Sequence, residues 1–348
     1  MTSRPMQALI SIVLAALVLA PDSGAENIQL KGAGGTFPAA IYGRWFDDYH
    51  NLHPEVKITY QPIGSGGGIR KVLDGTVDFG ASDGPMTDAQ LSEAKGKILH
   101  FPTVLGAVVP IMNVEGLSKS LAFTGEALAG IFLGKITRWN DPEIVKANPG
   151  VALPPKDIVV VHRADGSGTT FIWTDYLSKV SSEWQAKAGR GTAVEWPVGL
   201  AARGSDGIAK LVQQTSGAIS YVELTYALEN MLDFGAVKNS AGTFVHATVP
   251  AVTAAGSDVK DMPDDFRVSI TNAAGKDAYP IASFTWLLVP ANIREDGKRK
   301  AIVDLLRWMI GDGQRLAEPL SYAPLPKAVV DKEAEAIAQL DSPAVDSQ

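Results

Sequence analysis

The chain has 348 residues, of which 46% are hydrophobic and 20% are charged. At about 150 residues per domain this length favours two domains, and the composition excludes a disordered chain. The net charge of −7 comes without any basic stripe, which argues against nucleic acid as a partner. Cysteine is absent, which excludes disulfides, thiol catalysis and thiolate metal sites.

The N-terminal segment has the pattern of a secretion signal. One cation, Arg4, precedes an apolar run over 8–20 that only Ser11 interrupts, and small residues lie three and one positions before Glu26. Residues 1–25 are therefore predicted to be a signal peptide that is cleaved after Ala25. A membrane anchor is the weaker alternative, because a spanning helix needs about 20 apolar residues. An exported, unanchored chain without cysteine points to a Gram-negative periplasm.

Predicted strands and helices alternate in the first part of the chain. Strands are predicted over 28–32, 56–60 and 79–82. Helices are predicted over 38–49, 67–73 and 87–93. Ile41, Trp45 and Tyr49 recur at helical spacing in the first of these helices, and Thr87 is the expected N-cap of the third.

The same alternation continues to residue 310. Strands are predicted over 101–112, 158–162, 218–223 and 281–289. Helices are predicted over 124–134, 169–177 and 299–310. Residues 235–280 are less regular and are expected to form surface loops and short helices. The alternation indicates an α/β fold with parallel sheets that are covered on both faces. Because no low-complexity linker is visible, the chain is expected to cross between its two domains more than once.

Three glycine-rich turns share one design. They cover residues 32–38, 64–69 and 163–170, and each places a Ser or Thr beside glycines at the start of a helix. A helix N-terminus has unpaired N–H groups and about half a positive charge, and glycine lets an anion approach the backbone closely. One such turn is usually only a helix cap. Three together favour a single tetrahedral oxyanion that several helix N-termini hold.

Other kinds of site find little support in the sequence. There is no P-loop pattern and no G-x-S-x-G nucleophile elbow. His50 and His53 are neighbours, but Pro54 follows them, which is typical of a solvated helix end rather than of a metal site. We therefore expect no catalytic residue, no metal and no cofactor.

At these turns and at further motifs, the sequence resembles the periplasmic phosphate-binding proteins of high-affinity phosphate ABC transporters. The matching motifs are GAGGTFPA at 32–39, IGSGGG at 63–68, VDFGASD at 77–83, FPTV at 101–104, LGKI at 133–136, WND at 139–141, RADGSGT at 163–169, GAISYVE at 217–223 and YPI at 279–281. The resemblance covers essentially the whole mature chain in order. It is the combination of motifs that makes it specific.

The resemblance implies an α/β, two-lobed periplasmic-binding-protein type II fold, in which each lobe is a mixed, mainly parallel sheet flanked by helices. The chain would cross between the lobes near Gly106 and again near Ala282. Residues 26–106 and 282–348 would then form lobe I, residues 107–281 would form lobe II, and the last helix would pack on lobe I. The implied function is that of a monomeric receptor, not an enzyme, which binds inorganic phosphate and delivers it to the membrane permease subunits of an ABC transporter.

The resemblance also assigns the residues of the site. The implied phosphate ligands are Thr36, Phe37 through its backbone N–H, Ser65, Asp83, Arg163, Ser167, Gly168 and Thr169. Asp165 is expected to orient Arg163 without touching the ligand, and His162 is expected to be basic but not a ligand.

Asp83 needs a physical reason to lie in an anion site. An ionised carboxylate only accepts hydrogen bonds, and phosphate keeps a proton at neutral pH whereas sulfate does not. Asp83 is therefore expected to reject sulfate.

Two alternatives for these residues stay open in the sequence. Asp83 could instead cap the helical segment that follows Pro85, and Arg163 could form a structural ion pair with Asp165. Three alternative functions also remain, namely an exported phosphatase, a receptor for another oxyanion, and a structural or adhesive protein.

Overall fold

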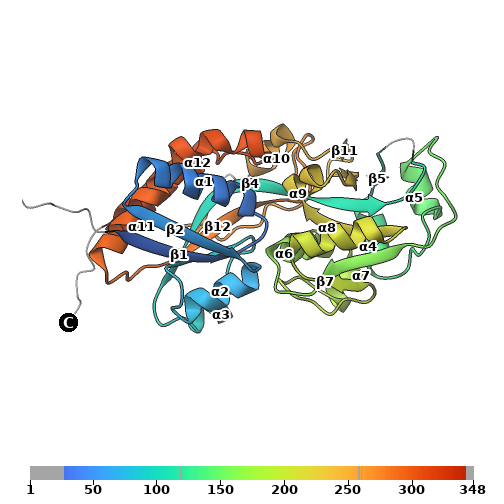
Figure 1. Cartoon of the computed structure of the whole chain (residues 1–348). Coiled ribbons are helices and arrows are strands. Elements are labelled where there is room, and N and C mark those ends of the chain that lie inside the picture. The colour runs from blue at the N-terminus through green and yellow to red at the C-terminus, as the bar shows by residue number, and fades with distance from the viewer. Residues whose placement is uncertain (1–26, 118–119, 258, 260, 342–348) are drawn as a thin grey trace, which may run out of the picture.

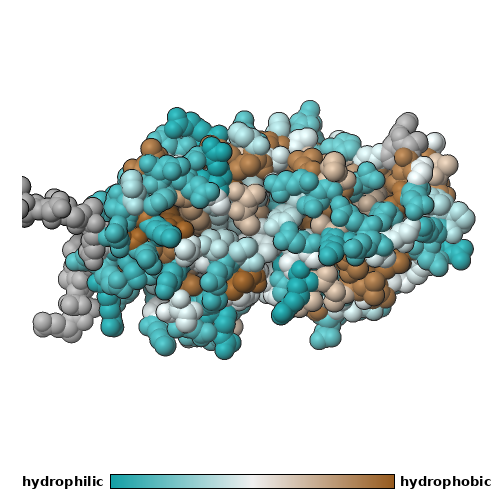
Figure 2. Space-filling view, in the orientation of Figure 1, coloured by the Kyte–Doolittle hydropathy of each residue, from teal (hydrophilic) through white to brown (hydrophobic). Residues whose placement is uncertain are grey.

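The computed structural model describes residues 27–117, 120–257, 259 and 261–341, so the predicted signal peptide lies outside the described residues. Figure 1 shows two lobes side by side, with the first and last parts of the chain in one lobe and the middle part in the other. Within the described residues, no helix is both long enough and apolar enough to cross a membrane. Figure 2 shows a face on which hydrophilic residues predominate over both lobes.

A mixed sheet runs through both lobes. Among the described residues it has nine strands in the order β2–β1–β3–β12–β4–β8–β6–β7, with β9 paired to β4, and a smaller sheet has the order β11–β10–β5. The strands are β1 (Ile28–Gly34), β2 (Val56–Pro62), β3 (Phe79–Ser82), β4 (Ile98–Asn113), β5 (Ala122–Phe123), β6 (Val159–Arg163), β7 (Leu200–Ala202), β8 (Ala218–Glu223), β9 (Asp233–Phe234), β10 (Ala236–Lys238), β11 (Phe244–Val245) and β12 (Ala282–Pro290).

Helices flank the sheet in each lobe. They are α1 (Ala39–Leu52), α2 (Ser65–Leu73), α3 (Asp88–Ser92), α4 (Gly125–Phe132), α5 (Pro142–Ala147), α6 (Gly168–Val180), α7 (Ser182–Lys187), α8 (Gly204–Gln214), α9 (Leu224–Glu229), α10 (Val249–Ser257), α11 (Asp296–Ile310) and α12 (Lys327–Asp341), with 3-10 turns η1 (Asp312–Leu316) and η2 (Glu318–Leu320). In the view of Figure 1, α1 and α12 lie above β1 and β2, and α2 and α3 lie below. The last helix, α12, packs on α11 and β4.

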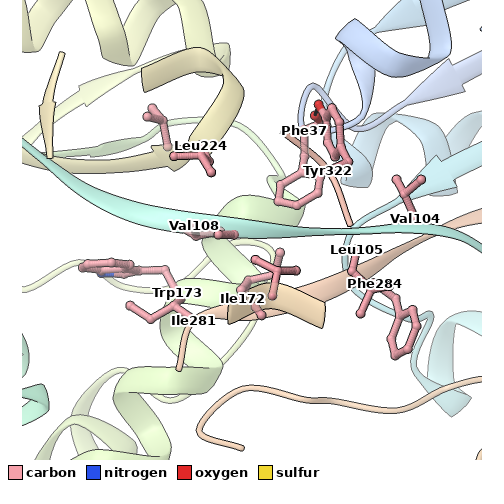
Figure 3. Close-up of a cluster of buried hydrophobic side chains, with 14 of the residues drawn as sticks. Phe37, Val104, Leu105, Val108, Ile172, Trp173, Leu224, Ile281, Phe284 and Tyr322 are labelled. Atoms are coloured by element: carbon pink, nitrogen blue, oxygen red, sulfur yellow. Dashed lines mark hydrogen bonds between the residues drawn. The ribbon is translucent and has the colours of Figure 1, made fainter. Parts of the chain in front are cut away.

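The long strand β4 joins the two lobes. Its residues 98–107 pair with β12, and residues 108–113 pair with β8, so the strand changes partner between Ala107 and Val108. Nearly every residue of β4 is buried, because both of its faces are covered. Figure 3 shows apolar side chains from both lobes gathered along the two sides of this strand, including Phe37 and Tyr322 on one side and Trp173 on the other. Burying side chains of this size contributes about 1.5–3 kcal/mol each.

The mixed α/β class with helices around the sheets is confirmed, but the parallel sheets that the alternation predicted are only part of it. Parallel pairs join β1 to β2 and β3, and join β6 to β7 and β8. The centre of the sheet is antiparallel, where β12 and β4 pair with each other and with β3 and β8. Alternation with helices predicts parallel crossovers, and it carries no information about strands that return by long irregular connections.

Most predicted elements agree with the structure to within three residues, with two differences that matter for the site. Helix α2 begins at Ser65 rather than at residue 67, because Gly64 has a φ of +87° and turns the chain directly into the helix. Helix α8, which was not predicted, begins with Gly204 and Ser205. The irregular region 235–280 contains the short helix α10, as expected, and also the short strands β10 and β11, which were not predicted.

Candidate functional site

The three glycine-rich turns meet in the structure. The N–H of Gly64 donates to the carbonyl oxygen of Gly34 at 2.8 Å, which joins the first two turns. The N–H of Gly66 donates to the carbonyl oxygen of Gly166 at 2.9 Å, which joins the second turn to the third across the two lobes. The turns therefore place the N-termini of α1, α2 and α6 around one buried region, as the sequence predicted.

Glycine at position 168 is required by the closeness of the lobes. A Cβ atom on Gly168, the first residue of α6, would lie 2.3 Å from Ser65 Oγ and 2.4 Å from Asp83 Oδ2. Contacts below 3.0 Å do not occur for real Cβ atoms, so a side chain there would push the two lobes apart. The N-terminus of α6 thus lies directly against Ser65 and Asp83 of the other lobe.

Asp83 follows β3 and is buried, with 1% of its surface exposed. Thr285 Oγ1 donates to its Oδ1 at 2.8 Å, and Ser65 Oγ donates to its Oδ2 at 3.2 Å. Burial raises the pKa of Asp83 to about 6, although these two hydrogen bonds favour the ionised form. The alternative that Asp83 caps the next helix is wrong, because the Thr87 side chain caps α3 by accepting from the N–H of Gln90.

Arg163, the last residue of β6, is buried beside Asp165. Its Nε donates to Asp165 Oδ1 at 2.9 Å and its Nη2 to Oδ2 at 2.5 Å, which is a bidentate pair. Burial alone would raise the pKa of Asp165, but the Arg163 guanidinium and the N–H of Gly204 hold it below its ordinary value. The pair fixes the direction of the guanidinium, which is the contact that the resemblance implied for Asp165.

The free end of the guanidinium points to hydroxyl groups. Arg163 Nη1 donates to Thr36 Oγ1 at 3.3 Å and to Ser205 Oγ at 3.4 Å, and the two hydroxyl groups lie 2.9 Å apart. Thr36 was predicted, but Ser205 was not. The signal that could have found it is the sequence Gly204-Ser205 at the start of α8, which repeats the glycine and hydroxyl design of the three predicted turns.

The start of α6 supplies further donors. Ser167 is its N-cap, and the Ser167 side chain accepts from the N–H of Thr170 at 3.1 Å. The Thr169 hydroxyl is buried and has no hydrogen-bond partner within the described residues. An unpaired buried hydroxyl costs about 1–3 kcal/mol unless something accepts its proton. Thr169 is therefore the clearest sign in the structure that the region is built for a ligand.

Phe37 follows Thr36 in the turn that leads into α1. Its ring is fully buried and packs edge-on against Tyr322, whose hydroxyl donates to the Phe37 carbonyl oxygen at 2.6 Å. This packing fixes the backbone at the start of α1. The backbone N–H that the resemblance assigned to the ligand is thus held by a rigid turn.

His162 departs from its predicted character. Its ring stacks on Trp196 at a centroid distance of 4.8 Å, and burial lowers its pKa below the ordinary value. Burial thus disfavours the protonated, positively charged ring, against the expectation that this residue is basic. His50 and His53 lie at the end of α1, and no group of described residues has the composition of a metal site.

The chemistry of the site is that of an oxyanion receptor. The hydroxyl groups of Thr36 and Thr169, the Arg163 guanidinium and three helix N-termini offer hydrogen-bond donors, and the Ser65 hydroxyl, which donates to Asp83 here, is a further one when it rotates. Asp165 neutralises Arg163, so the helix N-termini supply most of the positive potential, about half a charge each. Asp83 is the one carboxylate among these donors, and it can accept a proton from a ligand that carries one.

Comparisons with known proteins agree with this geometry. A family model described as the PBP superfamily domain matches residues 20–312. The phosphate-binding protein PstS of Xylella fastidiosa is 44% identical over 307 residues, which cover 88% of this chain and 84% of the relative. The phosphate-binding protein PstS of Pasteurella multocida is 39% identical over 334 residues, which cover 95% and 94%.

Solved structures share the fold. A phosphate-binding protein from Stenotrophomonas maltophilia has a TM-score of 0.67 at 20% identity, with 88% of this chain and 93% of that chain covered. An ABC-type phosphate transport receptor from Vibrio cholerae has a TM-score of 0.56 at 18% identity, with 85% and 100% covered. With the family model and the extent of the sequence identity, the chain belongs to the PstS family of phosphate-binding proteins within the PBP superfamily.

Proposed function

We propose that this protein is a periplasmic receptor that binds inorganic phosphate between its two lobes and delivers it to the permease subunits of an ABC transporter. The family consists of transport receptors rather than enzymes. The ligands would be Thr36, Phe37, Ser65, Asp83, Arg163, Ser167, Gly168 and Thr169, with Asp165 orienting Arg163. The protein would act as a monomer after removal of residues 1–25.

The lobes of the proposal are residues 26–106 with 282–348, and residues 107–281. The change of partner along β4 between Ala107 and Val108 supports the first boundary, and the start of β12 at Ala282 supports the second. Opening would then turn about these two strands. The anion would be released when the N-terminus of α6 moves away from Ser65 and Asp83.

In this proposal, Asp83 makes the site selective for phosphate over other oxyanions. It is a buried acceptor beside the N-terminus of α6 and the Ser65 hydroxyl. A phosphate monoanion or dianion has a proton to give it, whereas sulfate would place an unprotonated oxygen against a carboxylate. The carboxylate of Asp165, in the third glycine-rich turn, is only partly buried and is paired with Arg163.

Calorimetric titration tests the proposal directly. The protein is unfolded to remove bound ligand, refolded, and titrated with phosphate and with sulfate at pH 7. We expect phosphate to bind at least about 10⁴ times more tightly than sulfate. Arg163→Ala should weaken phosphate binding by two orders of magnitude or more, because it removes the cation of the site and leaves Asp165 unpaired.

The same titration separates the alternatives. If Arg163→Ala melts earlier but binds phosphate normally, Arg163 is only a structural ion pair with Asp165 and the site assignment fails. Equal affinity for sulfate would favour a general oxyanion receptor. Turnover of a chromogenic phosphate ester by metal-free protein would instead favour an exported phosphatase.

A further inference from the structure

Ser205 lies in the region of the anion site but on a helix outside the three predicted turns. It is the second residue of α8, and 1% of its surface is exposed. Its hydroxyl lies 2.9 Å from Thr36 Oγ1, which belongs to the other lobe, and 3.4 Å from Arg163 Nη1. The hydroxyl is thus directed across the cleft, and the N-cap residue of α8, Arg203, makes no side-chain cap hydrogen bond.

The Thr36 and Ser205 hydroxyl groups have two protons between them, and this number limits the hydrogen bonds that they can donate. Arg163 Nη1 donates to both hydroxyl oxygens, and one of the two hydroxyl protons lies between the oxygens of Thr36 and Ser205. One proton therefore remains to be donated elsewhere. When Ser205 donates to Thr36, two of the directions around Thr36 Oγ1 are taken by incoming hydrogen bonds. The Thr36 hydroxyl proton is then held in the remaining direction, and the guanidinium charge makes this hydroxyl a stronger hydrogen-bond donor.

The backbone beside Ser205 is fixed by the same network. The N–H of Gly204 donates to Asp165 Oδ1 at 3.0 Å, the oxygen that also accepts from Arg163 Nε. Gly204 has a φ of +68°, which allows the turn that brings Ser205 next to Thr36. The first turn of α8 is thus anchored to the buried ion pair, and Ser205 moves with it.

We propose that Ser205 is a further positioning residue of the anion site, which aligns the Thr36 hydroxyl for the bound oxyanion and slows release by linking the two lobes. This inference rests on the proposed function, since Thr36 is taken as a phosphate ligand. Ser205 acts through Thr36 and holds the closed arrangement, so its removal affects dissociation more than association.

Stopped-flow tryptophan fluorescence, which the seven tryptophans of the chain make practicable, gives both rate constants for phosphate. We expect Ser205→Ala to raise the dissociation rate and the Kd about two- to tenfold, the size of one net hydrogen bond, with little change in the association rate. Ser220→Ala is the matched control. Ser220 is also buried, but its hydroxyl donates to the Val161 carbonyl oxygen at 2.8 Å, so this variant should lose stability without a change in Kd.

A double-mutant cycle tests the route through Thr36. In a Thr36→Val background the Ser205→Ala change should have almost no further effect on Kd, because the hydroxyl that Ser205 positions is gone. An equal effect in both backgrounds overturns the inference, as does a wild-type Kd in Ser205→Ala. If the wild-type protein does not bind phosphate, the proposed function itself fails, which is a different result from wild-type binding that Ser205→Ala leaves unchanged.

Discussion

Asp83 combines burial with a position among hydrogen-bond donors. With a pKa of about 6 it is mostly ionised at pH 7, so it accepts hydrogen bonds from Thr285, from Ser65 and from a protonated ligand. A fully ionised ligand gains nothing from it and meets a like charge in a water-poor cleft. The carboxylate therefore weakens anion binding in general and favours anions that carry a proton.

Asp83→Asn should raise the affinity for sulfate relative to phosphate, since the amide can donate where the carboxylate could not. Titration calorimetry with both anions measures the ratio of the two affinities. Asp74→Asn, an exposed change at the end of α2, is the control and should leave the ratio unchanged. If Asp83→Asn alters thermal stability alone and both affinities stay as in wild type, the carboxylate does not select the ligand.

The pKa of Asp83 also predicts how the stability of the closed arrangement, in which this carboxylate is buried, depends on pH. The folded pKa of about 6 lies above the ordinary value of 3.8, so the folded state holds the proton more tightly than the unfolded state. Wild type should therefore lose stability relative to Asp83→Asn as the pH rises from about 4 to about 6. The stability lost over this pH range is roughly 3 kcal/mol, because a tenfold difference in proton affinity between the folded and unfolded states corresponds to about 1.4 kcal/mol. Urea unfolding of both proteins between pH 4 and pH 7 measures this difference, and parallel curves would refute it.

The residues of the site differ in how far the sequence alone could identify them. Arg163 and Asp165 are two positions apart, so their pairing follows from a local motif. Thr285 and Ser205 reach Asp83 and Thr36 from strands and helices that are distant in the sequence. Thr285 meets Asp83 through the pairing of β12 with β3 within one lobe, and Ser205 meets Thr36 where the two lobes face each other, and no local pattern carries that information.

Among the elements, the strands and helices with a complete hydrophobic pattern were predicted best. Strand β3 and strand β8 match the predicted ranges, and every residue of both strands is buried. Helix α12 was missed: Glu333 stands at a buried position of its inner face, where a helical pattern calls for an apolar residue. Helix α8 was missed because its first turn contains two glycines. The antiparallel pairing of β12 with β4 needed the tertiary structure.

Gly168→Ala tests the contact between α6 and the opposite lobe. The added Cβ would clash with Ser65 Oγ and Asp83 Oδ2, both across the cleft, so the lobes would be held apart while each stays folded. We expect phosphate affinity to fall at least about 100-fold, with a small change in the melting temperature of ligand-free protein. Gly43→Ala in α1 has open space around its Cβ and should instead stabilise the helix by about 0.5–1 kcal/mol with wild-type affinity. Wild-type affinity in Gly168→Ala would show that the cleft does not close this tightly.

For the whole molecule, the contacts across the cleft define a closed arrangement. They include the hydrogen bond from Gly66 to Gly166, the paired hydroxyls of Thr36 and Ser205, and the approach of Gly168 to Asp83. These contacts are few compared with the buried core along β4, which keeps the lobes connected in any state. A ligand that contacts both lobes stabilises the closed state alone. It therefore shifts the population of molecules from the open to the closed state.

Solution scattering should therefore show a smaller radius of gyration for the protein with phosphate than for the same protein after unfolding and refolding without it. The Gly168→Ala variant provides the control, because its cleft cannot close and its profile should stay that of the ligand-free state even at saturating phosphate. Identical wild-type profiles with and without phosphate would contradict closure about β4 and β12. We expect the wild-type protein to contract with phosphate and the variant not to contract. This pair of results would assign the contraction to the contact between α6 and the opposite lobe rather than to a general compaction by the anion.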